Sequence, residues 1–548
     1  MTNKAIVSRI RAVPKYFWVL LAIMIVGVFC RTYQFHDWLR FSPDEARDAT
    51  YISDAITGKA PLPALGPQAG NTQFYLGPLY YQAEYVSALV FGNAPDKIAY
   101  FDLIFSILSI PMLFLFLRKY FSVRMSLFLS ALLSVSLFAI QISRFASNPN
   151  TIPFFTLLFL YGLLGLADNG KAGKYRSAIS VGVGMGVGIQ LHTLLFLIMP
   201  LTAVGMCVYL LVKKNLTWQI FVVVLSFFLL MNYGQISYEL RTGGANSSQL
   251  FRGAGSESSV QGNTLLRNIS LITSCQMQAN THIIFSAINV QECGGMFNIA
   301  KSFKINRLVP AGATVNGVLF IAEMIATLLF SIGGYVLAIR ALRKEPREEK
   351  RTFLGLILFY NFISFIVLVP VASQIEVRYF SILFFIPFIL LGLWLDTCAG
   401  KKMKAIRLGA ADVLVMVMFL FVNVSVLIVS ARPYVDKSAS SVDDSILGEA
   451  ESMVAFLIAN TDSLGTVHID GSTMYLKRFL KPFDYIAKRS GSVVVRPGNK
   501  EPFVSGTRFF YIDGIKSRPY MIGDKVDGNA ILGYERFGRI MIYTLMKK

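Results

Sequence analysis

The sequence has few charged residues for a chain of 548 residues. Only 15% of them are charged and 54% are hydrophobic, whereas about 25% of the residues of a soluble domain are charged. This shortage excludes an ordinary water-soluble globular protein. The sequence also contains no internal repeat and no low-complexity tract, which argues against the transporters that are built from repeated halves.

Acidic residues are the scarcer kind of charge, with 32 Asp and Glu against 52 Lys and Arg and a formal net charge of +20. Such an excess can indicate a nucleic-acid partner. Here the basic residues stand in short clusters between apolar segments, which is the pattern that the positive-inside rule describes. We therefore expect the lipid bilayer, and no nucleic acid, as a partner of this chain.

Long apolar stretches are abundant. A membrane-spanning helix needs about 20 mostly apolar residues, and the sequence predicts an all-α polytopic domain of about eleven such helices. No small-residue cleavage site follows the first of them, so it is expected to remain as an anchor. The predicted spans are 16–33, 98–117, 125–142, 151–167, 177–191, 193–212, 218–234, 312–339, 352–371, 378–395 and 408–431.

The charges of the connections predict the orientation. If the N-terminus is cytoplasmic and the spans alternate, every cytoplasmic connection is basic, whereas the short outer connections 143–150 and 372–377 contain one Arg between them. The apolar run 79–93 would reverse all later spans if it crossed the membrane. Because it is short, it is predicted to lie at the outer face as an interfacial helix.

This orientation places three regions outside the cytoplasm and predicts two domains. Residues 1–431 form the membrane domain, with outer loops at about 34–97 and 235–311. Residues 432–548 form a small extracytoplasmic α/β domain, because a helical pattern after Ser440 is followed by short β-branched and aromatic runs. The chain is thus predicted to be a multi-pass protein of the inner (plasma) membrane with a periplasmic or extracellular C-terminal domain.

Cysteine is rare, with five residues in the chain. Cys30 and Cys207 fall in predicted spans, and Cys398 faces the cytoplasm. Cys275 and Cys293 share the long outer loop, where an oxidising compartment permits a disulfide. Closing a loop of this size contributes about 3 kcal/mol on the chain-entropy account. A disulfide between these two residues is predicted, and two unpaired thiols are the alternative.

The first outer loop carries an acidic motif directly after the first span. Residues 41–48 read FSPDEARD, in which Asp44 and Glu45 follow a proline and precede a helical run. The dipole at a helix N-terminus keeps such carboxylates ionised, and an ionised carboxylate can take the proton of an acceptor hydroxyl during group transfer. Asp44 and Glu45 are therefore the candidate catalytic residues, and a merely solvated membrane boundary is the alternative.

Further polar residues are predicted to lie on the same side of the membrane as Asp44, in three short outer connections. Ionisable groups at span ends are costly unless they have partners. Arg144 and Arg378 are suited to holding a phosphate by charge-assisted hydrogen bonds. An arginine in such a place also serves to cap a helix or to reach the headgroups, and that alternative stays open for each of them.

These motifs resemble those of the GT-C glycosyltransferases, specifically the bacterial branch similar to protein O-mannosyltransferases and the aminoarabinose transferase of lipid A. PDEAR at 43–47 is similar to the acidic motif of that family's first loop, and GPLYY at 77–81 to its juxtamembrane segment. SRFASN at 143–148 resembles its second outer loop, and EVRY at 376–379 its later Arg-Tyr motif. The resemblance covers about residues 10–400.

The resemblance implies an integral membrane glycosyltransferase, a hexosyl- or pentosyltransferase, that acts at the outer face. It would transfer a sugar from a polyprenyl-phosphate donor to a cell-envelope acceptor, which is a glycolipid, a polysaccharide or a protein. Asp44 would be the general base, and attack from the face opposite the leaving phosphate would invert the anomeric carbon. The implied donor-phosphate residues are Arg378, Arg144 and Tyr379, and the implied substrate-binding residues are His192, Glu376, Asn148 and Tyr80.

The sequence departs from the family pattern in two ways. Relatives often have a lysine before the juxtamembrane prolines, and here that place is Leu76, so phosphate binding would depend more on Arg378. Where some relatives have an acid in the second loop, this chain has Asn148 and Asn150. Because hard cations prefer charged oxygen ligands, we expect transfer without a metal and without another cofactor.

Three other functions remain open at this point. A transporter or flippase of lipid-linked glycans would place ionisable groups in the middle of its spans, whereas these spans are nearly free of acids, with Glu323 as the clearest exception. A catalytically inactive assembly protein of the same fold is the second alternative. Among enzymes, an oligosaccharide ligase or polymerase that uses a longer lipid-linked glycan is the third.

Overall fold

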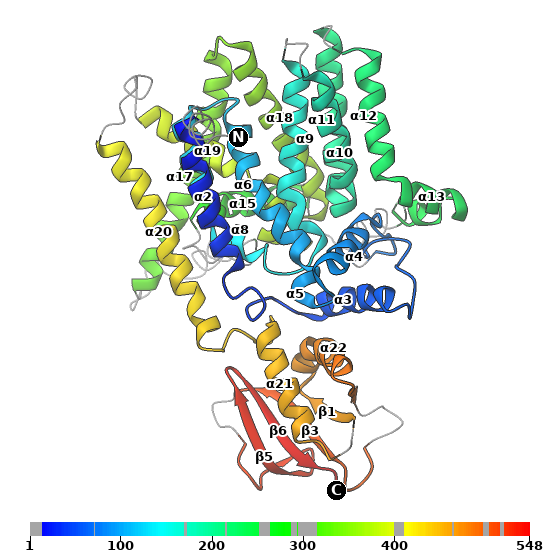
Figure 1. Ribbon diagram of the computed structural model, residues 1–548. Coiled ribbons are helices and arrows are strands. Elements are labelled where there is room, and N and C mark those ends of the chain that lie inside the picture. The colour runs from blue at the N-terminus through cyan, green and yellow to red at the C-terminus, as the bar shows by residue number, and fades with distance from the viewer. Residues whose placement is uncertain are drawn as a thin grey trace, which may run out of the picture.

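The computed structural model describes residues 14–548 apart from 71, 169–172, 214–215, 251, 253–263, 286–292, 294–314, 399–409, 463–464, 497–502 and 516–519, and describes only the backbone of 315–323 and 410–412. A bundle of helices makes up most of the molecule. A small sheet domain lies beneath it in Figure 1, against the end of the bundle that carries α3 (Pro43–Ile56) and α4 (Leu79–Phe91).

The other helices of the bundle follow in chain order, with three short 3-10 turns among them. They are α2 (Lys15–Thr32), α5 (Pro95–Ile98), α6 (Tyr100–Leu117), α7 (Val123–Val135), α8 (Leu137–Gln141), η1 (Asn148–Thr151), α9 (Ile152–Ala167), α10 (Lys174–Leu191), α11 (Thr193–Val212), α12 (Trp218–Met231), α13 (Tyr233–Thr242), α15 (Leu265–Ile284), α17 (Val315–Lys344), α18 (Glu348–Leu368), η2 (Val369–Gln374), η3 (Val377–Leu383), α19 (Ile386–Cys398) and α20 (Ala410–Val435).

Within the described residues, seven helices are long and apolar enough to cross a membrane, and there are up to nine spans if each of two bent helix pairs counts as one. The bent pairs are α12 with α13, at 69°, and η3 with α19, at 68°. The chain is thus a multi-pass, mostly helical membrane protein, as predicted. The predicted count of eleven spans is not confirmed.

Two predicted spans depart from the pattern of a straight apolar helix. Span 125–142 is broken at Ser136 into α7 and α8, and α7 has only 13 residues. Helix α10 is rich in glycine, which lowers its hydropathy. A Cβ on Gly182 would lie 2.6 Å from the carbonyl oxygen of Val224 in α12. The glycines therefore allow α10 to pack closely against its neighbours, as small residues do between membrane helices.

A buried arginine stabilises the break in span 125–142. Arg31, at the end of α2, is fully buried and donates hydrogen bonds to the carbonyls of Leu133 (3.1 Å) and Ser134 (2.9 Å) in the last turn of α7. Its Nε donates to the hydroxyl of Ser106 at 3.0 Å. The carbonyls at the end of α7 have no partner within the helix, and lipid offers none. Arg31 supplies the hydrogen bonds that these carbonyls need.

The segment predicted as the outer loop 235–311 differs from that expectation in its described part. Helix α15 lies inside the bundle and packs on η2, η3, α17 and α19. It carries many polar residues, which made it look like a surface loop. These side chains find partners inside the bundle: Gln276 Nε2 donates to the hydroxyl of Tyr335 and to the amide oxygen of Asn361, both at 2.6 Å.

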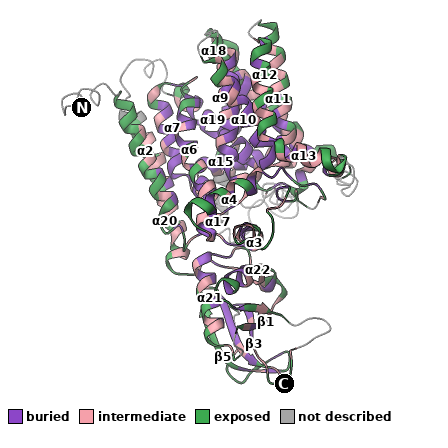
Figure 2. Ribbon diagram, turned by 45° about the vertical axis from the view of Figure 1, so that its right-hand side comes forward, coloured by how far each residue is buried: buried purple, intermediate pink, exposed green. Residues whose placement is uncertain are grey.

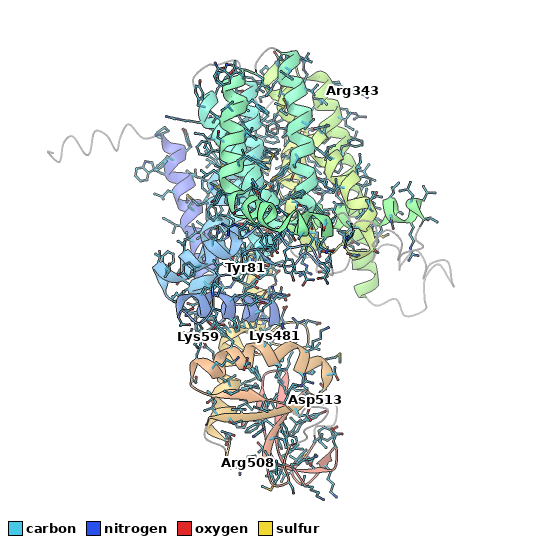
Figure 3. All side chains as sticks on the ribbon, turned by 90° about the vertical axis from the view of Figure 1, so that its right-hand side faces the viewer. Lys59, Tyr81, Arg343, Lys481, Arg508 and Asp513 are labelled. Atoms are coloured by element: carbon cyan, nitrogen blue, oxygen red, sulfur yellow. A yellow bond between two sulfur atoms is a disulfide. The ribbon has the colours of Figure 1, made fainter. Side chains whose placement is uncertain are left out.

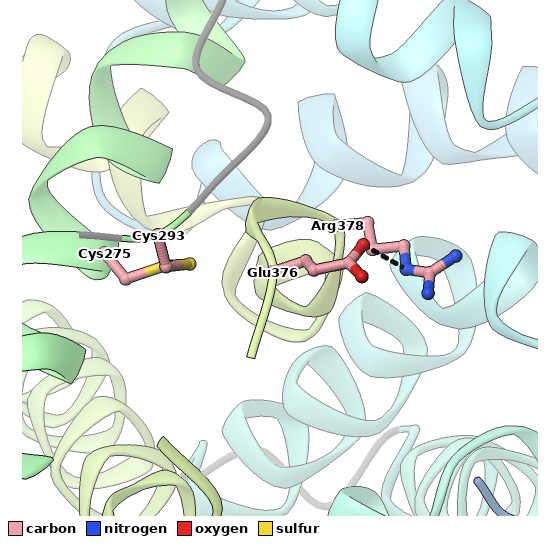
Figure 4. The surroundings of a disulfide bond; sticks show 4 residues. All are labelled: Cys275, Cys293, Glu376 and Arg378. Carbon is pink, nitrogen blue, oxygen red and sulfur yellow. Dashed lines mark ion pairs between the residues drawn. A yellow bond between two sulfur atoms is a disulfide. The ribbon is translucent and has the colours of Figure 1, made fainter. Parts of the chain in front are cut away.

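The predicted disulfide is confirmed. Cys275, in the buried middle of α15, is bonded to Cys293, with 4.8 Å between their Cα atoms. Figure 4 shows the bond in the same region as the ion pair of Glu376 and Arg378. The disulfide therefore fixes the chain at position 293 to the helix that supports η2 and η3.

The C-terminal domain contains a mixed six-stranded sheet in the order β2-β1-β3-β6-β5-β4. β1 pairs in parallel with β2 and β3, and the remaining neighbours are antiparallel. The small α/β domain is thus confirmed. Its elements are α21 (Leu447–Ala459), β1 (Thr466–Gly471), α22 (Thr473–Arg489), β2 (Val493–Val495), β3 (Arg508–Gly514), β4 (Lys525–Val526), β5 (Asn529–Phe537) and β6 (Ile540–Met546).

The C-terminal domain shares a hydrophobic core with α3 and α4. Figure 2 shows buried residues continuing from α3 into α21 and α22, and the ring of Tyr485 in α22 lies 5.4 Å from that of Phe41. His36 bridges the two parts, since its ring nitrogens lie 3.4 Å from Asp96 in α5 and 3.0 Å from Glu451 in α21. Hydrogen bonds to these carboxylates raise the pKa of His36 to about 10, so the bridge is charged at neutral pH.

The disulfide generates a first prediction. Among the described residues the remaining cysteines, Cys30, Cys207 and Cys398, are free. Alkylation of the denatured protein should therefore label three thiols before reduction and five after it, as counted by mass spectrometry. The double variant Cys275→Ser/Cys293→Ser should be less stable to unfolding by about 3 kcal/mol. Five reactive thiols in the unreduced protein would contradict the bond.

Candidate active site

Asp44 lies at the start of α3 with its side chain 80% exposed. Ser42 is the N-cap and Pro43 the first helical residue, a combination that favours a helix start at this point. The carboxylate of Asp44 contacts the guanidinium of Arg47, one turn later, at 3.0 Å. The structure thus presents an exposed carboxylate whose direction is set by an arginine on the same helix.

Glu45, the second residue of the predicted catalytic pair, has a different position. Its side chain is buried, and its carboxylate accepts a hydrogen bond from the backbone amide of Ser42 at 3.0 Å. The carboxylate also lies 3.8 Å from Nε of Arg40, while burial raises the pKa of Glu45. These contacts favour a helix-capping role for Glu45 over a role as base.

A hydrogen-bonded network continues from Asp44 into the protein. Arg47 contacts Asp48 at 2.8 Å, and Asp48 accepts a hydrogen bond from the hydroxyl of Tyr81 at 2.9 Å. Burial raises the pKa of Asp48, although its bonds to Arg47 and Tyr81 oppose that effect. In Figure 3 the labelled Tyr81 marks where α4 meets α3 at the lower edge of the bundle. The network holds Arg47, and through it Asp44, in one orientation.

The juxtamembrane segment 77–81 is fixed against the end of α10. The backbone amide of Leu79 donates to the side-chain oxygen of Gln190 at 3.3 Å. A Cβ on Gly77 would lie 2.1 Å from that same oxygen, so a larger residue there would displace the side chain of Gln190. Leu76 is buried, so this position supplies no cation. The predicted substrate residue Tyr80 is also buried, beneath the surface.

Arg144, predicted to hold the donor phosphate, is engaged in structural contacts. Its guanidinium donates to the carbonyls of Arg31 (3.0 Å) and Gln34 (2.8 Å) at the end of α2, and it lies over the rings of Phe35 and Trp38. The side chain is 8% exposed. These contacts favour the alternative role, in which Arg144 caps a helix.

The asparagines of the second outer loop are also used within the fold. Asn148 donates to the carbonyl of Leu191 at 2.5 Å, at the end of α10. Asn150 donates to the carbonyl of Phe145 at 2.8 Å within its own loop. Asn148 therefore holds the second outer loop against the turn that contains His192.

The structure brings four of the predicted residues together near that turn. Arg378 pairs with Glu376 at 2.9 Å, and both side chains are more than half exposed. The ring of His192 stands edge-on to that of Tyr379, with 5.2 Å between ring centroids. His192 Nδ1 accepts the amide of Leu194 at 3.2 Å, as the N-cap of α11. Burial and the charge of Arg378 lower the pKa of His192 to about 4, so the ring is neutral at pH 7.

The Asp44 network and the Arg378 cluster lie at the same end of the bundle. Gln190 contacts α4, which carries Tyr81, and His192, two residues later, contacts Tyr379. Side chains of adjacent elements thus lead from one group to the other. Figure 4 shows the two terminal guanidinium nitrogens of Arg378 pointing away from Glu376. The exposed carboxylate and the exposed guanidinium therefore belong to the same side of the membrane domain.

A groove of about 310 Å³ opens between α4 and the bend that joins α12 to α13. Leu79, Leu230 and Met231 supply its apolar wall, and Tyr238 and Arg241 lie on the polar side. A groove with one apolar and one cationic side suits a lipid with an anionic head. Arg241 falls in the predicted outer loop 235–311, and the 69° bend that brings it to the groove is not visible in a hydropathy pattern.

The described residues include no group of three or more His, Cys, Asp and Glu side chains placed to hold a metal ion. The metal-independence expected from Asn148 and Asn150 stays a prediction.

Comparison with known proteins gives a fold but no close relative. No family model matches the chain, and no curated protein matches its sequence. Among solved structures, ArnT from Cupriavidus metallidurans, bound to undecaprenyl phosphate, is similar with a TM-score of 0.50 and 12% identity, over 96% of this chain and 97% of that one. The oligosaccharyltransferase of Archaeoglobus fulgidus, complexed with Zn and sulfate, has a TM-score of 0.51 at 12% identity.

The chain has the GT-C fold. It matches the archaeal oligosaccharyltransferase over 89% of its own length and spans 63% of that longer protein. The ArnT structure, in contrast, matches nearly end to end. The GT-C architecture therefore extends to the C-terminal sheet domain in the comparison with ArnT.

The pKa of His192 generates a second prediction. Because its folded pKa is about 4 and its unfolded value is about 6.5, the unfolded chain binds a proton in this window and the folded chain does not. The stability that the neutral ring of His192 contributes is therefore fully present above pH 6.5. This contribution decreases as the pH falls towards 4, by up to about 1.4 kcal/mol per pH unit. In His192→Asn, which keeps an N-cap acceptor, thermal unfolding should lose this part of the acid sensitivity. An identical acid dependence in both proteins would contradict a neutral His192.

Proposed function

We propose that this protein is an integral membrane glycosyltransferase which transfers a sugar from a polyprenyl-phosphate donor to an acceptor of the cell envelope. The observation that carries the proposal is the exposed carboxylate of Asp44, oriented by Arg47 at 3.0 Å, on the same side of the GT-C bundle as the exposed guanidinium of Arg378. The ArnT structure with the same fold is bound to undecaprenyl phosphate, which supports a lipid-linked donor.

The reaction assigns a role to each group. Asp44 accepts the proton of the acceptor hydroxyl as its oxygen bonds to the anomeric carbon. The bond between that carbon and the phosphate oxygen breaks, and the polyprenyl phosphate leaves with the electron pair. Arg378 stabilises the negative charge of the leaving phosphate, which is the main electrostatic demand of such a transfer. Attack opposite the leaving group inverts the anomeric carbon.

The groove at α4 and α13 accounts for the lipid part of the donor. Its apolar wall of Leu79, Leu230 and Met231 would hold the first prenyl units. Arg241 and Tyr238, on the other side, would lie at the level of the headgroup. The neutral ring of His192 adds no positive charge beside Arg378.

The proposal also includes the topology. The basic connections between the predicted spans support a cytoplasmic N-terminus and an extracytoplasmic C-terminal domain, with the transferring end of the bundle in the periplasm or at the cell surface. An acceptor that is a glycolipid, a polysaccharide or a protein would approach the exposed side of α3, next to α22.

Replacement of Asp44 generates a third prediction. Asp44→Asn should lower sugar transfer by about 100-fold or more, the usual contribution of a general base. Its thermal midpoint should stay close to that of the wild type, because Ser42 and Glu45 cap the helix without it. Activity would be followed as transfer from a radiolabelled polyprenyl-phosphate sugar in membranes.

The matched control is Asp54→Asn, an acid on the same helix outside this network, which should leave transfer unchanged. Full activity of Asp44→Asn would reject Asp44 as base. A phenotype in whole cells that survives Asp44→Asn would instead favour the inactive assembly protein. Transport of a lipid-linked glycan across vesicles without sugar transfer would favour the flippase.

A further inference from the structure

Two fully buried carboxyl groups lie behind the candidate site and are not used in the proposed reaction. Glu84, in α4, and Asp102, in α6, both have no exposed surface. Neither oxygen of Glu84 makes a hydrogen bond, nor does Oδ1 of Asp102. The other oxygen of Asp102 accepts the backbone amide of Ser147 at 3.3 Å. The carboxyl groups therefore lie where α4, α6 and the second outer loop meet.

The groups around Glu84 are themselves acidic or neutral. The carboxyl groups of Asp102, Asp48 and Glu45 interact electrostatically with Glu84. The hydroxyl of Tyr80 lies near Glu84 but makes no hydrogen bond of good geometry with it. The main influences on its pKa are burial, these acids and Tyr80. The elements that pack on α4 carry the following charged groups: Asp44, Glu45, Arg47, Asp48 and Asp54 on α3, Asp96 and Lys97 on α5, Asp102 on α6, and Lys174 and Arg176 at the far end of α10.

An ionised carboxylate in such a place would be very unfavourable. A buried charge without a partner costs several kcal/mol or more, and a group so placed usually becomes neutral instead. Here burial, followed by the neighbouring acids, raises the pKa of Glu84 well above its ordinary value. The same causes raise the pKa of Tyr80. The proximity of the Tyr80 hydroxyl acts in the opposite direction, but burial and the neighbouring acids outweigh it and favour the protonated acid.

We propose that Glu84 is a positioning residue which keeps its proton at neutral pH and forms, with Asp102, an uncharged junction that holds α4 and the second outer loop in place behind α3. The junction supports the site from two directions. Helix α4 carries Tyr81, which orders Asp48 and Arg47, and Ser147 stands beside Asn148, which holds the turn at His192. Loss of the proton would set a negative charge against Asp48 and loosen both supports.

Stability has a definite pH dependence under this proposal. A folded-state pKa above the unfolded value of about 4.5 means that the folded chain retains a proton which the unfolded chain releases. The stability that Glu84 contributes is then full below pH 4.5 and is lost progressively as the pH rises towards its folded pKa. Glu84→Gln, which resembles the protonated acid and does not titrate, should escape this loss.

The experiment compares thermal midpoints of the purified full-length protein in detergent from pH 5 to pH 9. The midpoint of Glu84→Gln relative to wild type should rise steadily across this range, and Asp102→Asn should behave likewise. The control Glu535→Gln, an exposed acid on β5, should differ from wild type by a constant amount. A constant difference for Glu84→Gln would overturn the proposal. If Glu84→Gln does not fold, Asp102→Asn and the wild-type profile decide in the same way.

A bound cation is the competing explanation for two buried acids. If millimolar MgCl2 or CaCl2 raised the thermal midpoint of the wild type but not that of Glu84→Gln, the proposal of a protonated Glu84 would be overturned and a bound metal ion would explain the two acids. These midpoints do not depend on the proposed function and remain valid if Asp44→Asn is fully active. A second expectation does rest on the proposed function. The pH at which sugar transfer declines on the alkaline side should be higher in Glu84→Gln than in the wild type, whereas a purely structural role of Glu84 would leave the pH dependence of transfer unchanged.

Discussion

Inside a bilayer every backbone carbonyl at a broken helix end needs a partner from the protein itself, and this requirement organises the end of the bundle that carries Asp44. Arg31 satisfies the last turn of α7, Arg144 satisfies the end of α2, and Asn148 satisfies the end of α10. Each of these contacts joins segments that are distant in the sequence. The hydrogen bonds that satisfy the carbonyls at these helix ends therefore also align the outer loops. The candidate site lies where helices are interrupted.

The motifs of the site were visible in the sequence, but the roles of their members were not. Asp44 is exposed, whereas Glu45 caps the helix and Arg144 binds carbonyls about 110 positions away. Local spacing cannot reveal such a partner, because it depends on which helix end lies within reach after folding. Glu84 was overlooked for a related reason, since one acid in an apolar run carries no sign of the second acid that faces it from α6.

The count of eleven spans is not confirmed, for physical reasons that differ from helix to helix. Hydropathy assumes straight apolar helices, and this fold interrupts them: Ser136 divides one span, and η3 meets α19 at 68°. In α15 polar residues such as Gln276 make a helix of the bundle look like a water-exposed loop. The side-chain amide of Gln276 donates hydrogen bonds to Tyr335 and Asn361 within the bundle. The C-terminal domain was easier to predict, because its alternating strands and the amphipathic α22 follow rules for water-soluble folds.

The bond between Cys275 and Cys293 also constrains the order of assembly. Cys275 has no accessible surface in the finished fold, and an enzyme that oxidises thiols needs access to both sulfur atoms. In the topology proposed above, Cys275 and Cys293 would reach the oxidising side of the membrane and be cross-linked there before α15 enters the bundle. Export, oxidation and helix packing would then be consecutive steps in the biogenesis of this protein.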